Sequence, residues 1–105
     1  MNKVILRYLP LFFDDLKEAV DYIRVTLQNE KAAEDLINDV EQAILKRSEN
    51  PTSFEQYISF KKRKYPYYRI YVKNYVVYYV VIPNDPPIME MRRFLYNKRN
   101  RDFII

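Results

Sequence analysis

Residues 67–82 read YYRIYVKNYVVYYVVI, and this stretch decides the fold. Tyrosine, valine and isoleucine favour β-strands, so the stretch predicts two strands, at residues 67–72 and 75–82. Lys73 and Asn74 lie between them and predict a tight turn, because asparagine tolerates a positive φ. We therefore expect a β-hairpin here.

The segments around this hairpin predict two more strands. Residues 83–87, PNDPP, predict a second turn, and a last strand follows it from residue 88 to residue 95 or 96. Residues 51–66 are polar with single aromatics and predict a loop, with room for a short helical turn. Near the start of the chain, residues 4–8 predict a first strand, which Pro10 ends.

Two helices are predicted between the first strand and the loop. Residues 12–27 and 30–47 both carry apolar side chains at helical spacing, with charged residues on the opposite side. Asn29 separates them and is the expected N-cap of the second helix. The order is β-α-α-β-β-β, which predicts an α+β fold with a helical hairpin packed on one face of a small antiparallel sheet. Residues 1–105 are expected to form a single domain.

Composition excludes several classes of function. The chain has no cysteine, histidine or glycine, which excludes disulfides, thiol catalysis and glycine-rich phosphate loops. We therefore expect no metal site and no cofactor, and any acid–base chemistry must use Lys, Arg, Tyr, Asp or Glu.

No apolar run approaches the roughly 20 residues that span a bilayer, and no signal peptide is recognisable. A soluble cytoplasmic protein is expected.

Charge is divided unevenly along the chain. Residues 1–60 carry 7 basic and 11 acidic side chains, a net charge of −4. Residues 61–105 carry 11 basic and 3 acidic side chains, a net charge of +8. The imbalance indicates a basic functional face and an anionic partner, either a nucleic acid or an acidic polypeptide.

Alternation along residues 67–72 separates two sets of side chains. Tyr68, Ile70 and Val72 are expected in the core. The opposite set, which includes Arg69 and Tyr71, forms a cationic and aromatic stripe suited to phosphate pairing and base stacking, or simply a solvated strand face. In residues 75–82, Tyr75 and Tyr79 are expected in the core. Tyr78 of this strand and Tyr71 of the strand before it are expected to be exposed.

Arginines in the last predicted strand have two interpretations. Strict alternation places Glu90 and Arg92 together with Phe94 and Tyr96, and leaves Arg93 on the apolar side. A β-bulge or a salt bridge must resolve this, and a structural ion pair, for example with a helix acid, is the favoured role of both Arg92 and Arg93. For Tyr96 and Arg99, a functional role is favoured. The residues expected to bind RNA or a protein partner are Lys61, Lys62, Lys64, Lys73, Tyr78 and Lys98.

Three segments of the chain resemble the RelE/ParE toxins of type II toxin–antitoxin systems. Residues 11–23, with Asp15-Leu16 and Tyr22-Ile23, are similar to the first helix of that family. Residues 68–79 look like its central hairpin, and residues 90–100, EMRRFLYNKRN, resemble its closing strand and basic exit. The resemblance implies the same element order and an antitoxin that keeps the toxin silent.

Carrying over the catalytic positions of RelE-like members gives a mixed result. Two lysines of that family correspond to Arg69 and Tyr71, and an arginine on the next strand corresponds to Val76. An arginine after the last strand matches Arg99. The family's late tyrosine has no direct counterpart here, and Tyr96 or the tail is the candidate to substitute for it. The resemblance therefore names Arg69, Tyr71, Tyr96 and Arg99 as the candidate catalytic residues.

Three functions remain open. RelE-like toxins cut mRNA on the ribosome, whereas ParE-like toxins share the fold and inhibit DNA gyrase without being enzymes. The third possibility is a degenerate toxin that acts only as an antitoxin-binding module. In every case the resemblance implies a hetero-oligomer with a cognate antitoxin. The lack of an apolar run of membrane-spanning length predicts no association with a membrane.

Overall fold

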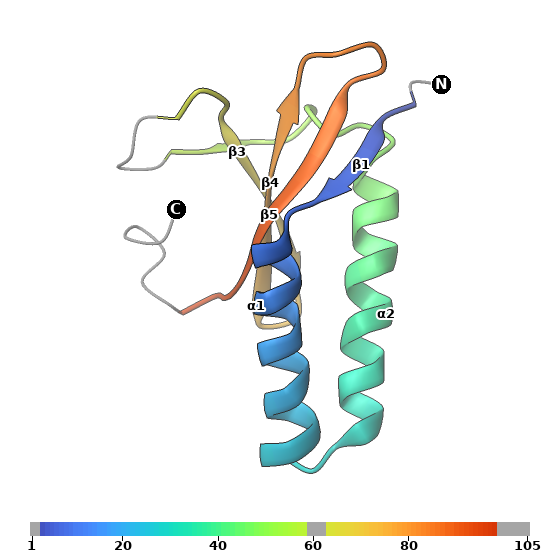
Figure 1. The fold of residues 1–105 in the computed structure, drawn as a ribbon, viewed down its shortest axis with the longest axis vertical. Coiled ribbons are helices and arrows are strands. Elements are labelled where there is room, and N and C mark those ends of the chain that lie inside the picture. The colour runs from blue at the N-terminus through green and yellow to red at the C-terminus, as the bar shows by residue number, and fades with distance from the viewer. Residues whose placement is uncertain (1–2, 59–62, 99–105) are drawn as a thin grey trace.

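Two long helices and a five-stranded sheet form the part of the chain that the structure, a computed structural model, describes: residues 3–58 and 63–98 (Figure 1). The elements are β1 (Ile5–Tyr8), α1 (Pro10–Asp21), η1 (Tyr22–Thr26), α2 (Glu30–Arg47), β2 (Gln56–Tyr57), β3 (Tyr67–Val72), β4 (Tyr75–Ile82) and β5 (Ile88–Tyr96). The predicted bounds of α2 and of β3, β4 and β5 are confirmed. The predicted loop before β3 contains the additional two-residue strand β2.

The strand order in the sheet is β1-β5-β4-β3-β2. Four neighbouring strands pair antiparallel, from β5 to β2, as predicted. The edge strand β1 instead runs parallel to β5, so the sheet is mixed and not wholly antiparallel. Parallel pairing needs a long connection between the paired strands, and here the helical hairpin lies between β1 and the rest of the sheet. The α+β class is confirmed.

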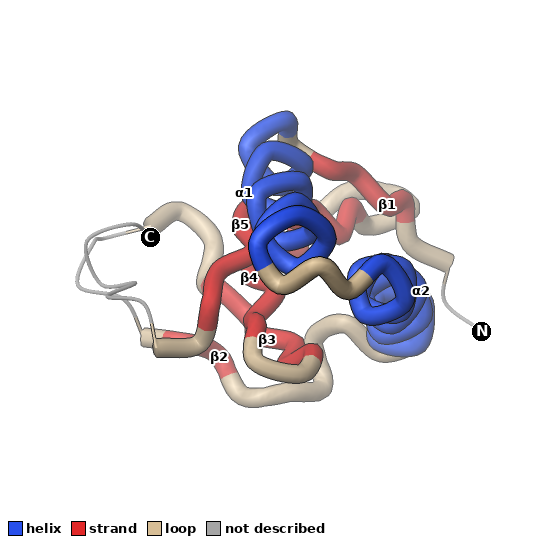
Figure 2. The backbone as a smooth tube through the Cα atoms, turned by 90° about the horizontal axis from the view of Figure 1, so that it is seen from below, coloured by secondary structure: helices blue, strands red, loops and turns tan. Residues whose placement is uncertain are grey.

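Both helices lie side by side on one face of the sheet (Figures 1 and 2). Pro10 stands in the first turn of α1, where its missing N–H is not needed. Asn29 caps α2 as predicted, since its side chain accepts a hydrogen bond from the Ala32 N–H at 3.0 Å. The predicted first helix ends differently, because its last turn, η1, is a π-helix.

The main core lies between the helices and the sheet. Tyr68, Ile70 and Val72 of β3 are buried in it, as the alternation predicts. Tyr79 is fully buried there and Tyr75 packs against it, which confirms the core positions expected for both. The helices contribute Phe12, Ala19, Val20, Ala33, Leu36, Val40 and Ile44.

A β-bulge in β5 decides where its side chains point. The register shifts so that Tyr78 pairs with Arg93 while Tyr79 pairs with Met91, which leaves Arg92 as the extra residue. Met91 and Phe94, three positions apart, therefore both enter the core beneath the helices. The expectation that Phe94 shares a face with Glu90 and Arg92 is wrong for this reason.

Arg93 is neutralised by the ion pair that its apolar surroundings require. Its Nε and Nη2 donate to the carboxylate of Asp15 on α1 at 2.7 and 2.9 Å. This hydrogen bond is the largest cause of the raised pKa of Arg93. Asp15 also accepts the backbone N–H of Phe94 at 3.0 Å. The predicted helix–arginine pair is confirmed, and it ties α1 to β5.

Candidate functional site

The face of the sheet turned away from the helices, called the far face, carries a second aromatic cluster. Tyr67, Val76, Tyr78, Val80 and Leu95 are buried in this cluster, and Tyr57, Tyr65 and Ile82 pack against it. Alternation along β3 and β4 places these side chains opposite the main core. The far face is therefore a packed layer with polar groups around it.

Arg69 lies beside two tyrosines at the surface of this layer. Its guanidinium carbon is 5.0 Å from the ring centroid of Tyr57 and 5.7 Å from that of Tyr71. Tyr71 is 56% exposed. An arginine supported by aromatic rings keeps donors available for a phosphate or carboxylate, while an exposed tyrosine offers a surface for stacking. Arg69 and Tyr71 lie on the same face of β3, as the alternation predicts.

A second group of cations surrounds Tyr67. The guanidinium carbons of Arg63 and Arg92 lie 5.6 and 6.0 Å from its ring centroid. Arg92 also donates to the Glu90 carboxylate, which is almost fully buried, at 2.8 Å. Arg7 of β1 donates to the same carboxylate at 2.6 Å. Two arginines share one acid, so the network keeps a net positive charge.

We call the residues of these two groups on the far face the cationic patch. It comprises Arg7, Arg63, Arg69 and Arg92 with Tyr57 and Tyr71, and the buried Tyr67 lies beneath Arg63 and Arg92. Sequence reasoning missed Arg7, which lies 83 residues from Glu90 along the chain. The available signal was alternation in residues 4–8, which places Arg7 opposite the apolar Leu6 and Tyr8.

Tyr78 does not have the exposure that was expected of it. Its side chain is 0% exposed, and the rings of Tyr57 and Tyr67 meet it edge-on at 5.6 and 6.2 Å. The expected exposure of Tyr78 is therefore wrong. Its ring supports the residues that carry the cationic patch.

Tyr96 lies on the other side of the sheet from Tyr71. It pairs with Tyr75 across β4 and β5 and meets that ring edge-on at 5.7 Å, on the face that the helices cover. Tyr71 instead pairs with Val76, which belongs to the far-face cluster. The structure thus brings Arg69 and Tyr71 together and separates them from Tyr96. Arg99 lies outside the described residues.

The predicted binding lysines are distributed over several places. Lys73 forms an ion pair with Asp39 of α2 at 3.3 Å, and Lys64 lies 5.5 Å from the ring centroid of Tyr65. Lys98 is exposed just after β5. Lys61 and Lys62 lie outside the described residues.

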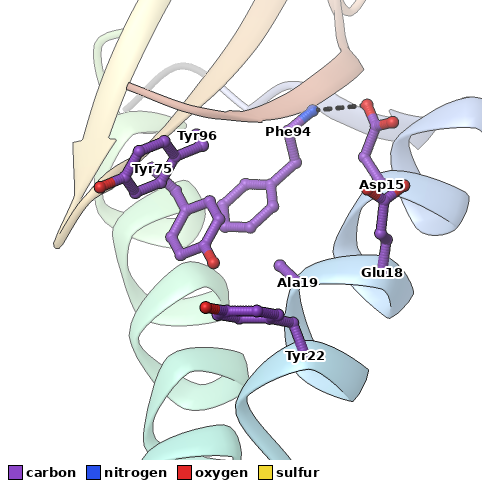
Figure 3. A pocket seen from close by; sticks show the side chains of 7 residues that line it. All are labelled: Asp15, Glu18, Ala19, Tyr22, Tyr75, Phe94 and Tyr96. Carbon is purple, nitrogen blue, oxygen red and sulfur yellow. Dashed lines mark hydrogen bonds between the residues drawn. The ribbon is translucent and has the colours of Figure 1, made fainter. Parts of the chain in front are cut away.

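A hollow of about 470 Å³ opens between α1 and the ends of β4 and β5. Figure 3 shows the side chains around it. We call it the aromatic hollow, and it is lined by Asp15, Glu18, Ala19, Tyr22, Tyr75, Phe94 and Tyr96. Tyr75 stacks on Phe94 at 4.9 Å. Burial raises the pKa of Tyr75, and nearby Tyr96, Tyr22 and Glu18 raise it further, so the hollow disfavours additional negative charge.

Residues 3–58 and 63–98 contain no group of three or more carboxylates placed to hold a metal ion. The same residues contain no helix that is long and apolar enough to cross a membrane.

Comparison with known families agrees with this architecture. Residues 6–101 match the family model described as the ParE toxin of the type II toxin–antitoxin system parDE. The chain belongs to the ParE toxin family. A search of curated proteins finds no match to this ParE-family toxin. Because family members are the toxin halves of toxin–antitoxin pairs, a cognate antitoxin is implied as its partner.

Proposed function

We propose that this ParE-family toxin arrests growth by binding DNA gyrase, and that it is not a nuclease. It would act in the cytoplasm as a single domain that its antitoxin silences. The proposal chooses between the two activities of the wider RelE/ParE group, inhibition of gyrase and cleavage of mRNA on the ribosome.

The choice of gyrase over mRNA cleavage rests on the separation of Tyr71 from Tyr96. RNA cleavage through the ribose 2′-OH needs a base, an acid and a cation within reach of one phosphate. Tyr71 and Arg69 belong to the far face, and Tyr96 belongs to the face that the helices cover. These described candidates cannot converge on one phosphate without rearrangement of the sheet.

Val76 adds to the argument. It stands where RelE-like toxins have a catalytic arginine, and here it is only 1% exposed within the far-face cluster. A buried valine supplies packing and no charge, so the position contributes nothing to holding a phosphate.

The cationic patch is the surface that we expect to bind either the target or the acidic part of the antitoxin. Its four arginines offer charge-assisted hydrogen bonds, and Tyr57 and Tyr71 beside Arg69 offer apolar area, which together are the usual composition of a strong binding surface. If gyrase and the antitoxin bind the same patch, a bound antitoxin prevents the toxin from binding gyrase. This competition would explain how the antitoxin silences the toxin.

Supercoiling by purified gyrase tests the proposal. Increasing amounts of toxin should abolish supercoiling of relaxed plasmid, and added antitoxin should restore it. The double variant Arg69→Ala/Tyr71→Ala should weaken inhibition by about tenfold or more, whereas Lys31→Ala, on the exposed side of α2, should leave it unchanged. Supercoiling that is unaffected by excess toxin would refute gyrase as the target.

A second candidate, mRNA cleavage, is favoured by the contact of Arg69 with Tyr57 and Tyr71, because such a cluster can hold phosphate and stack bases. Primer extension on transcripts taken after induction distinguishes the two functions. Codon-linked cuts that disappear in Arg69→Ala would support this candidate, and intact transcripts during growth arrest would exclude it.

A further inference from the structure

The aromatic hollow has the composition of a receptor for a positive charge. Tyr22, Tyr75 and Tyr96 contribute three tyrosine rings to its lining, and Phe94 contributes a fourth ring (Figure 3). The faces of such rings attract ammonium and guanidinium groups. Tyr22 and Tyr96 are 53% and 43% exposed, so these rings are accessible from solvent.

The hollow also contains a carboxylate that is available to a ligand. Asp15 is already occupied by Arg93 and by the Phe94 N–H. Glu18, one turn further along α1, is exposed and forms no ion pair with the lysines and arginines of residues 3–58 and 63–98. Asp15 and Arg93 cancel, so Glu18 gives the hollow a net negative charge.

We propose that the aromatic hollow receives one basic side chain, an arginine or a lysine, of the cognate antitoxin. The cation would lie against the tyrosine rings and pair with the Glu18 carboxylate, a combination stronger than either contact alone. An antitoxin that also covers the cationic patch would then present acids to the far face and one base to the helix side. The proposal rests on family membership and does not depend on which target the toxin attacks.

Binding of a small cationic probe tests the hollow itself. N-acetylarginine amide is titrated into the isolated full-length toxin while the ring resonances of Tyr22, Tyr75 and Tyr96 are followed by NMR. These resonances should shift together and saturate in the millimolar range. N-acetylcitrulline amide has nearly the same shape without the charge, and it should bind at least about tenfold more weakly. Equal binding of the two amides would overturn the proposal.

Three variants separate charge from ring contact. Glu18→Gln and Tyr22→Ala should each weaken probe binding by about five- to tenfold, whereas Tyr22→Phe should retain it because the attraction comes from the ring face. Glu34→Gln, an exposed acid on α2, is the matched control and should have no effect. Glu18 and Tyr22 are exposed, so thermal unfolding should be unchanged and should show that each variant is folded. Unaltered binding by Glu18→Gln would contradict the role of the carboxylate.

The purified toxin–antitoxin complex tests the occupant. In the complex the antitoxin should fill the hollow, so the probe should no longer shift the three tyrosine resonances. Glu18→Gln should also raise the Kd of the complex by about tenfold, and Glu34→Gln should not. Probe binding that is the same with and without antitoxin would overturn the assignment of the antitoxin as the occupant, even if the isolated toxin binds the probe.

Discussion

Asp15 makes three hydrogen bonds that join α1 to β5, two from Arg93 and one from the Phe94 N–H. Strand β1 pairs with β5 only as far as Met91. Beyond that point, Asp15 supplies the acceptor that a neighbouring strand would otherwise provide. The Asp15 side chain therefore neutralises the nearly buried Arg93. It also accepts a backbone N–H at the edge of β5 that would otherwise lack a partner.

Replacement of Asp15 should be costly. Asp15→Asn should lower the free energy of unfolding by about 3 kcal/mol, because it leaves Arg93 without its counter-charge in a mostly buried position. Urea denaturation followed by circular dichroism measures this change. Asp14→Asn alters an exposed neighbour and should change stability by less than about 0.5 kcal/mol. Similar stability of the two variants would show that the ion pair contributes little.

Tyr79 is a buried tyrosine whose hydroxyl connects distant segments. It donates to the Pro51 carbonyl at 2.6 Å and accepts from Arg47 Nη1 at 2.9 Å. Burial raises the pKa of Tyr79, although the Arg47 hydrogen bond opposes this effect. The unfolded chain therefore loses this proton at a lower pH than the folded chain.

The pH dependence of stability follows from that shift. Below about pH 10 the tyrosine is neutral in both states and its contribution to stability is complete. As the pH rises through the raised folded pKa, the unfolded state binds fewer protons and the free energy of unfolding falls. Tyr79→Phe should cost about 1 kcal/mol at pH 7, and the difference from the unaltered protein should shrink above about pH 10. A difference that stays constant to pH 11 would contradict the raised pKa.

At the scale of elements, two residues between the helices determine the turn of the helical hairpin. Asn29 caps α2, and Gln28 just before it adopts a positive φ of 50°. The hairpin of β3 and β4 contains a similar position, but there Lys73, with φ 54°, adopts the positive φ that the sequence assigned to Asn74. Neither turn has a glycine, so both accept some strain.

Removal of the Asn29 cap tests how much this local signal contributes. Asn29→Ala should lower the free energy of unfolding by about 1 kcal/mol, because the Ala32 N–H loses its partner. Asn38→Ala, in the exposed middle of α2, is the matched control and should be neutral or slightly stabilising. Chemical denaturation compares the two, and equal losses would argue against the cap.

At the scale of the whole molecule, charge is separated between the two faces. The cationic patch covers the far face, while Asp14, Glu18 and Asp21 lie on α1. The sequence placed this division between residues 60 and 61, with −4 before it and +8 after it. Arg7 is an exception to this division. It belongs to the acidic half of the sequence but lies in the cationic patch, because β1 pairs with β5.

Affinity for the antitoxin should depend on salt. Acidic residues of the antitoxin would be attracted to the +8 half, and this attraction is screened as ionic strength rises. Isothermal titration calorimetry should show the Kd increasing by about tenfold between 50 and 500 mM salt. The double variant Arg63→Ala/Arg69→Ala should reduce this dependence. An affinity that is independent of salt would mean that apolar contacts alone hold the complex.

The sequence by itself determined the family and most of the elements, although not the short strand β2 or the π-helical turn η1. Helix α2 and strands β3, β4 and β5 have the predicted bounds because their signals are local: apolar periodicity, runs of tyrosine and valine, the Asn29 cap and the two turns. The positions of Tyr68, Ile70 and Val72 in the core followed from simple alternation. Alternation also identified Arg69 and Tyr71 as neighbours on one face.

Only the tertiary structure decided which of the other candidates meet. The bulge at Arg92 reversed the alternation of β5, so Tyr96 joined the helix side instead of the face of Arg69. A second aromatic cluster buried Tyr78, and β1 brought Arg7 to Glu90. These outcomes depend on pairing between residues as much as 83 positions apart, which local periodicity does not encode.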